Sequence, residues 1–146
     1  MERRASHEGF VELIDGGQFL AAEEIFSERR TNDPMEMVVR SEVAMYFDRL
    51  DEAESLLEEV GPGIGDISIA ARYSLTKGRL ALWRGRVQQA ETQLQSAYHF
   101  YLFLNDSFGI SRSLLNLARL DREHGKLEEA AANLDAAQNG IRGRTW

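Results

Sequence analysis

The segment GRVQQAETQLQSA, residues 85–97, decides the fold. Its glycine ends one helix and the next apolar residue opens another, because glycine adopts backbone conformations that other residues avoid. Ala90 is small enough for two helix backbones to approach closely. Leu94 and Ala97 then continue an apolar stripe at helical spacing. The segment therefore predicts the turn and the second helix of a helical hairpin.

The same pattern occurs at three other places along the chain. Each copy has a turn residue, an alanine five residues later and a large apolar residue four residues after that. The four copies are Gly17, Ala22 and Phe26; Asp48, Ala53 and Leu57; Gly85, Ala90 and Leu94; and Gly125, Ala130 and Leu134. Each copy is interpreted as one unit of two helices.

A first helix is predicted before each turn, because apolar residues recur there at helical spacing and no long segment alternates as a strand would. These helices are expected over residues 4–15, 35–47, 68–84 and 108–124. Pro34 is expected to close the first unit, since proline stops a helix. The sequence thus predicts an all-α chain forming a single domain over residues 1–146. Its antiparallel hairpins are expected at about 3–34, 35–66, 67–106 and 107–141, with the glycine-rich stretch 61–66 as a link.

This pattern resembles the tetratricopeptide repeat over nearly the whole chain. Gly78 and Ala118 are the small residues inside the first helices of two good copies, whereas the second copy has Arg40 and Ser41 in that stretch. The resemblance implies a right-handed α-α superhelix whose first helices line a concave, peptide-binding groove. The longer last two copies are similar to repeats of bacterial signalling and transcription regulators, which implies a cytoplasmic regulatory module.

Composition excludes several classes of protein. The 146 residues contain no Cys, which removes disulfides and thiolate metal sites and fits a reducing cytoplasm. A net charge of −7 argues against nucleic acid as the partner, and no apolar run approaches the ~20 residues of a membrane span. The start Met1-Glu2-Arg3-Arg4 leads into no apolar stretch, so no secretory signal is expected.

No residue pattern points to catalysis. His7, His99 and His124 are too far apart in sequence for a helical ligand pair, so we expect no metal. The stretch 74–77 fits the S-x-x-K serine motif without its companion motifs. We therefore expect no enzyme activity and no cofactor. The aromatic residues of the third copy, Tyr98, Phe100, Tyr101 and Phe103, are expected to pack in the core.

The first helices of the last two hairpins carry arginines in register. Arg72 and Arg79 are seven residues apart, as are Arg112 and Arg119, so each pair shares one helix face. The resemblance places on the groove Arg72, Leu75, Thr76, Arg79, Leu82, Trp83, Arg112, Leu115, Asn116, Arg119 and Arg122. Guanidinium groups bind carboxylates through two parallel hydrogen bonds, and a tryptophan can anchor an apolar residue. We expect Arg72, Arg79, Trp83, Arg112, Asn116 and Arg119 to bind a protein or peptide with an acidic segment.

Two alternatives remain open. The arginines could form a solvated face paired at helical spacing, as in Arg119 with Glu123. The chain could also form homo-oligomers, because residues 1–60 carry a net charge of −10 and residues 61–146 one of +3. Arg144-Thr145-Trp146 stand where a fifth unit would begin. We therefore expect a fragment of a longer chain, whose uncapped end face could also associate.

Overall fold

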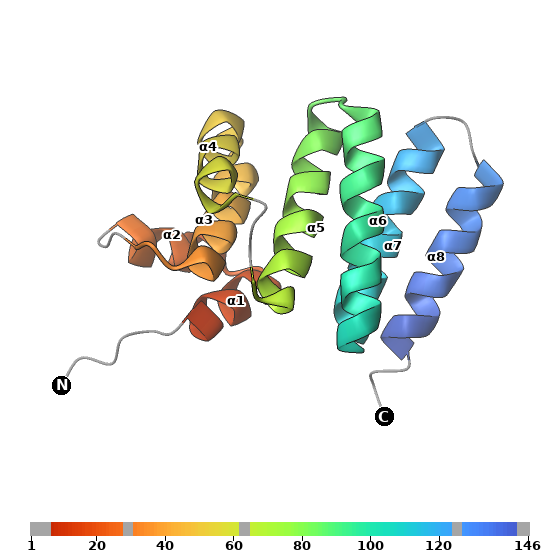
Figure 1. Ribbon diagram of the computed structural model, residues 1–146, viewed down its shortest axis with the longest axis horizontal. Coiled ribbons are helices and arrows are strands. Elements are labelled where there is room, and N and C mark those ends of the chain that lie inside the picture. The colour runs from red at the N-terminus through yellow and green to blue at the C-terminus, as the bar shows by residue number, and fades with distance from the viewer. Residues whose placement is uncertain (1–6, 28–30, 62–64, 124–126, 143–146) are drawn as a thin grey trace. The chain divides into compact units, whose positions relative to one another are not determined.

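The computed structural model describes residues 7–27, 31–61, 65–123 and 127–142. Within these ranges the chain forms eight α-helices and no strand, which confirms the all-α prediction (Figure 1). The chain divides into two compact units, Met1–Gly63 and Ile64–Trp146, which are described separately. The superhelical arrangement and the single domain stay predictions.

The first unit contains four short helices. They are α1 (His7–Asp15), α2 (Phe19–Ser27), α3 (Pro34–Tyr46) and α4 (Leu50–Val60). Helix α3 packs against all three of the others, and α1 also contacts α2. Ala22, Val38 and Ala53 are fully buried, so the core of this unit surrounds α3.

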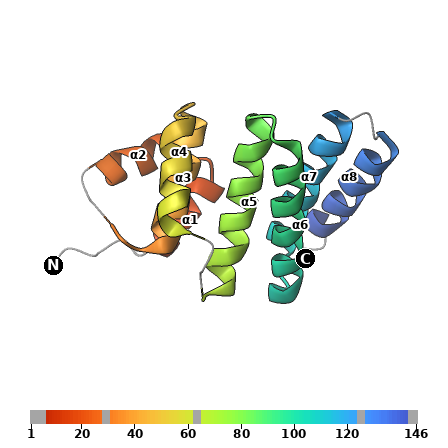
Figure 2. The same cartoon turned by 45° about the horizontal axis from the view of Figure 1, so that its top comes forward.

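The second unit contains four longer helices. They are α5 (Ile67–Trp83), α6 (Val87–Leu104), α7 (Ser107–Glu123) and α8 (Leu127–Arg142). Successive helices lie side by side and run in opposite directions, as two views show (Figures 1 and 2). Helix α6 packs against α5 and α7, α7 packs against α8, and α5 also contacts α7. The predicted first helices 35–47, 68–84 and 108–124 each appear one residue earlier.

The hairpin turns close through one repeated arrangement of the backbone. Gly17, Asp48 and Gly85 have φ angles of 76°, 61° and 73°, in the left-handed region that favours glycine. The amide that follows each donates to a carbonyl five residues earlier. These bonds run from Gln18 to Leu13, from Arg49 to Ala44 and from Arg86 to Ala81, each at 2.8 Å. They form the Schellman closure of a helix C-terminus. Asp48 therefore adopts the left-handed conformation that glycine adopts in the other turns. Gly125 lies outside the described residues.

The alanines after these turns are fully buried. Ala22, Ala53 and Ala90 are each 0% exposed. Gly78 on α5 faces Leu94 on α6 so closely that a Cβ at Gly78 would lie 2.7 Å from Leu94 Cγ. The structure thus agrees with the close helix contacts that the sequence predicts, while the side chain of Ala130 lies outside the described residues.

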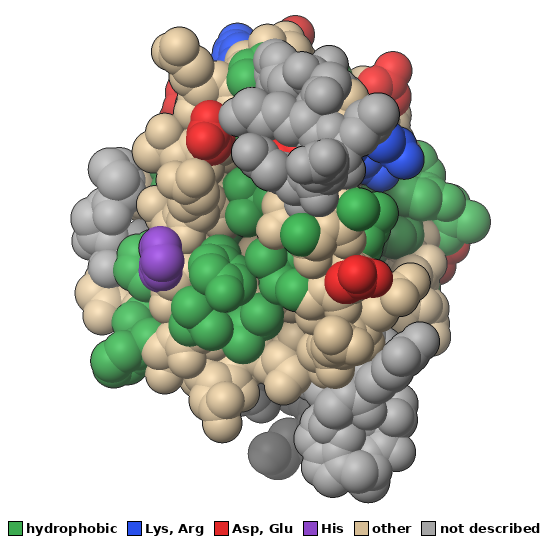
Figure 3. Space-filling model, turned by 90° about the vertical axis from the view of Figure 1, so that its right-hand side faces the viewer, with side chains coloured by type: hydrophobic (Ala, Val, Ile, Leu, Met, Phe, Trp, Pro, Cys, Tyr) green, Lys and Arg blue, Asp and Glu red, His purple; other side chains and the backbone are tan. Residues whose placement is uncertain are grey.

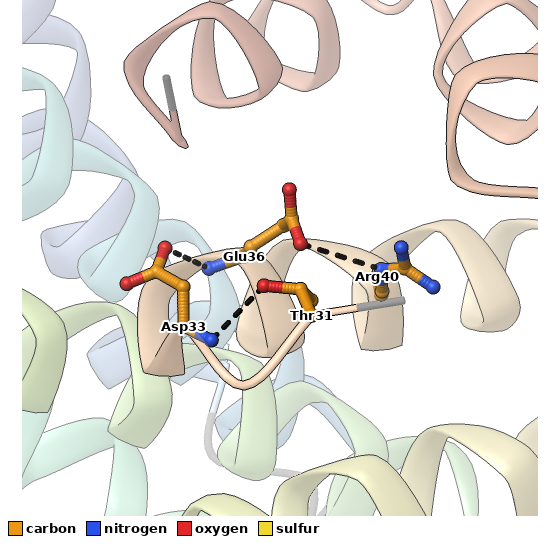
Figure 4. Close-up of polar contacts among 4 residues, drawn as sticks. All are labelled: Thr31, Asp33, Glu36 and Arg40. Atoms are coloured by element: carbon orange, nitrogen blue, oxygen red, sulfur yellow. Dashed lines mark hydrogen bonds and ion pairs between the residues drawn. The ribbon is translucent and has the colours of Figure 1, made fainter. Parts of the chain in front are cut away.

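The prediction that Pro34 closes a helix is wrong. Pro34 is the first residue of α3, where its missing N–H costs nothing because first-turn amides have no partner within the helix. Asp33 caps this helix, with Oδ2 accepting from the Glu36 amide at 3.1 Å (Figure 4). Thr31 Oγ1 in turn accepts from the Asp33 amide at 3.0 Å. The proline therefore fixes the start of α3.

Phe103 also departs from its prediction. Tyr101 is buried and Phe100 packs against the same core, but Phe103 is 77% exposed. Two residues along a helix correspond to a rotation of about 200°, so Phe103 lies opposite Tyr101. The aromatic run therefore belongs only partly to the core.

We expect Asp48→Gly to raise the free energy of unfolding of the first unit by about 1 kcal/mol, because glycine adopts the left-handed conformation without a Cβ penalty. Asp48→Ala should lower it by a similar amount, since alanine also lacks the aspartate's local hydrogen bonding. Urea denaturation followed by circular dichroism measures both. Equal midpoints for the two variants would contradict the role of the turn.

We expect Ala90→Leu to destabilise the second unit by roughly 1–3 kcal/mol through overpacking, since Ala90 is fully buried between helices. Ala136→Leu is the matched control, because Ala136 on α8 is exposed. Thermal denaturation compares the two substitutions. A midpoint for Ala90→Leu equal to that of the control would show that the hairpin register is wrong.

Candidate functional site

Arginines from two helices surround a hollow of about 390 Å³ on the second unit. Its lining comes from α5, α7 and α8 and consists of Arg79, Arg112, Leu115, Asn116, Ala118, Arg119, Arg122 and Leu134. Four of these described residues are arginines and none is acidic. We call this feature the arginine hollow.

The contact between α5 and α7 brings the arginines together. Arg79 lies near the end of α5, whereas Arg112 and Arg119 lie two turns apart along α7. Asn116 lies between them, and its Nδ2 donates to the Arg112 carbonyl oxygen at 2.8 Å. The Arg112 guanidinium lies 5.5 Å from the centre of the Phe108 ring, within reach of a cation–π interaction. These contacts orient the α7 wall of the hollow.

Helix α8 supplies the far edge of the hollow and is held against α7 by a buried hydrogen bond. Ser111 Oγ donates to the Ala137 carbonyl oxygen at 3.0 Å. Gly140 leaves room for this serine, because a Cβ there would lie 2.5 Å from Ser111 Oγ. The bond sets α8 beside α7 and so places Leu134 at the hollow.

The lining combines positive charge with exposed apolar surface. Arg119 and Arg122 are exposed, whereas Arg79 and Arg112 are partly buried. Leu115 and Leu134 are 39% and 38% exposed, high values for large apolar side chains. On the α8 side of the molecule, hydrophobic side chains gather in the middle of the face, acidic ones lie beside them and basic ones lie toward the edge (Figure 3). Such a surface suits an anionic ligand that also has an apolar part.

Four of the six predicted binding residues line the arginine hollow: Arg79, Arg112, Asn116 and Arg119. Arg72 does not, since it is buried at 6% exposure. Trp83 is 52% exposed at the end of α5 but is also absent from the lining. The structure therefore unites the α7 residues with one arginine of α5.

Other groove predictions for α5 are wrong. Leu75 and Leu82 belong to the core clusters, and Thr76 is fully buried. The reason is that α5 contacts both α6 and α7, which leaves it a narrower open face than the pattern of residues suggests.

Leu134 departs from its prediction in the opposite way, because it is more exposed than the sequence predicts. It follows the repeated alanine and was expected in the buried stripe, yet it is partly exposed and lines the hollow. Nothing in its spacing separates it from Leu94, which is fully buried at the matching position. Leu94 lies in α6, which packs against two helices, whereas α8 packs against α7 alone among the described helices.

The rest of the described chain offers few groups for chemistry. No three side chains of His, Asp or Glu within it gather as a metal site would require. Lys77 Nζ, from the S-x-x-K stretch, donates to the Tyr73 hydroxyl at 3.3 Å. None of the described helices is long and apolar enough to cross a membrane.

Comparisons of the chain with protein-family models, with curated proteins and with solved structures found no match.

Proposed function

We propose that this chain is a non-enzymatic scaffold of the tetratricopeptide type that binds an acidic segment of a protein or peptide in the arginine hollow. The observation that carries the proposal is the meeting of four arginines around one hollow whose described lining has no acidic residue.

The repeat character of the two units supports a scaffold. Both units repeat the left-handed turn and the buried alanine after it. In both, the first helices of neighbouring hairpins touch, α1 with α3 and α5 with α7. Stacked hairpins of this kind present their first helices as a binding surface. A regulatory part of a bacterial, cytoplasmic signalling or transcription protein is the setting that we propose.

The lining of the hollow indicates which features of a ligand would raise its affinity. A carboxylate gains two parallel hydrogen bonds from one guanidinium, and each charge-assisted bond contributes more than a neutral one. Leu115 and Leu134 add apolar area that a purely ionic ligand would leave uncovered. The two exposed arginines are screened by salt, so the affinity should fall as ionic strength rises.

A fluorescent peptide of alternating Glu and Leu residues tests the proposal, with a Gln-for-Glu peptide as its neutral counterpart. We expect the acidic peptide to bind and the neutral peptide not to bind. Arg119→Glu should raise the dissociation constant of the acidic peptide about tenfold or more, a loss of about 1.4 kcal/mol of binding free energy. Arg86→Glu is the matched control, because Arg86 is exposed in the same unit but does not line the hollow. Fluorescence anisotropy measures the dissociation constants.

Equal losses in Arg119→Glu and Arg86→Glu would attribute binding to net charge and refute a site at the hollow. Equal binding of the acidic and neutral peptides would refute the acidic ligand. Circular dichroism of both variants establishes that each remains helical.

A further inference from the structure

The chain itself carries an acidic segment on the surface of α4. Asp51, Glu52, Glu58 and Glu59 are exposed, while Ala53 and Leu57 are buried. Helical geometry places these four acids on one side and the two buried residues on the other. Helix α4, Leu50–Val60, contains no Lys or Arg, so the charges that its own side chains contribute to this face are all negative. We call these four exposed acids the acidic face of α4.

The spacing of the acidic face matches that of the arginine hollow. Asp51 and Glu58 are seven residues apart, as are Glu52 and Glu59. Arg112 and Arg119 have the same separation on α7. At 1.5 Å per residue, each pair spans about 10.5 Å along its helix. Two acidic positions of α4 therefore have the same axial spacing as two arginine positions of α7.

The apolar parts of the two surfaces correspond as well. Leu56 borders the acidic face of α4 and is only partly buried. Leu115 and Leu134 lie exposed among the arginines of the hollow. An acidic helix with one flanking leucine therefore offers carboxylates to the arginines of the hollow and an apolar side chain to its leucines.

We propose that the acidic ligand of the arginine hollow is α4 of a second copy of this chain, so that copies associate head to tail. The inference rests on the proposed function, because it names the partner of the same hollow. Glu58 and Glu59 contribute most of the attraction. Glu52 contributes less, because its Oε2 lies 3.6 Å from an Nη atom of Arg49 in its own chain, and this ion pair already offsets part of its charge.

Such an interface joins two different surfaces and is therefore heterologous. Each copy keeps one free hollow or one free acidic face, so association continues into longer assemblies or closes as a ring. The contact is made of exposed charges, and salt weakens it. The average mass in solution should therefore rise with protein concentration and fall with ionic strength.

Two neutralised variants test this arrangement by sedimentation velocity. Glu58→Gln/Glu59→Gln removes charge from the acidic face, and Arg112→Gln/Arg119→Gln removes it from the hollow. We expect each variant alone to be monomeric under conditions where the wild type associates. Mixed together they should form 1:1 dimers and nothing larger, because only one intact hollow and one intact acidic face remain per pair. Glu12→Gln/Asp15→Asn, which neutralises two exposed acids of α1, is the matched control and should associate like the wild type.

A wild-type chain that stays monomeric at every concentration and salt would overturn the inference. So would a mixture that contains no 1:1 dimer, or neutralised variants that still associate alone. The proposed function is tested independently of this inference, because its experiment uses a free acidic peptide. A monomeric chain whose hollow still binds that peptide would keep the hollow as a binding site and assign it to another protein.

Discussion

The left-handed residue at each hairpin turn is the constraint on which the rest of the described structure depends. At Gly17, Asp48 and Gly85 the backbone takes a positive φ, and the next amide bonds back to the helix it has just left. The chain therefore reverses within a few residues, and the second helix must begin against the first. The alanine that follows then falls at the line of contact, where only a small side chain fits.

The arginine hollow follows from this close packing. Gly78 lets α6 approach α5 until Leu94 fills the space beside it, and α7 then packs on α6 near enough to touch α5. Arg79 and the α7 arginines consequently share a surface although at least 33 residues separate them in the chain. A larger residue at Gly78 would push α6 away from α5, so the arginine hollow depends on a glycine that does not itself line it.

The sequence locates most of the helices and part of the hollow, and the errors about exposure have one cause. Turn residues and apolar spacing are local, so α3, α5 and α7 appear within one residue of their predicted bounds and Asp48 is recognised in a glycine position. Spacing gives the angle of a residue around its own helix but not the number of helices that cover it. Leu75 was expected in the groove and is buried, whereas Leu134 was expected in the core and is partly exposed. The prediction for Pro34 is wrong for a different reason, because proline is compatible both with the end of one helix and with the first turn of the next.

The contrast between net charge and local charge narrows what the hollow can bind. The chain carries −7 overall, yet its hollow gathers four arginines. At physiological ionic strength a charge is felt over about 8 Å, so a ligand in the proposed site experiences the four arginines together with neighbouring acids such as Asp121, next to Arg122, and Asp135, next to Leu134. A long polyanion such as duplex DNA would extend past the hollow, and residues 61–146 outside its four arginines contain 7 basic and 8 acidic residues, a net charge of only −1, which offers no further attraction. A short acidic helix needs no more positive surface than the four arginines supply. Under the proposed function, the charge distribution therefore favours ligands with a short charged face, and α4, with two acid pairs about 10.5 Å long, has such a face.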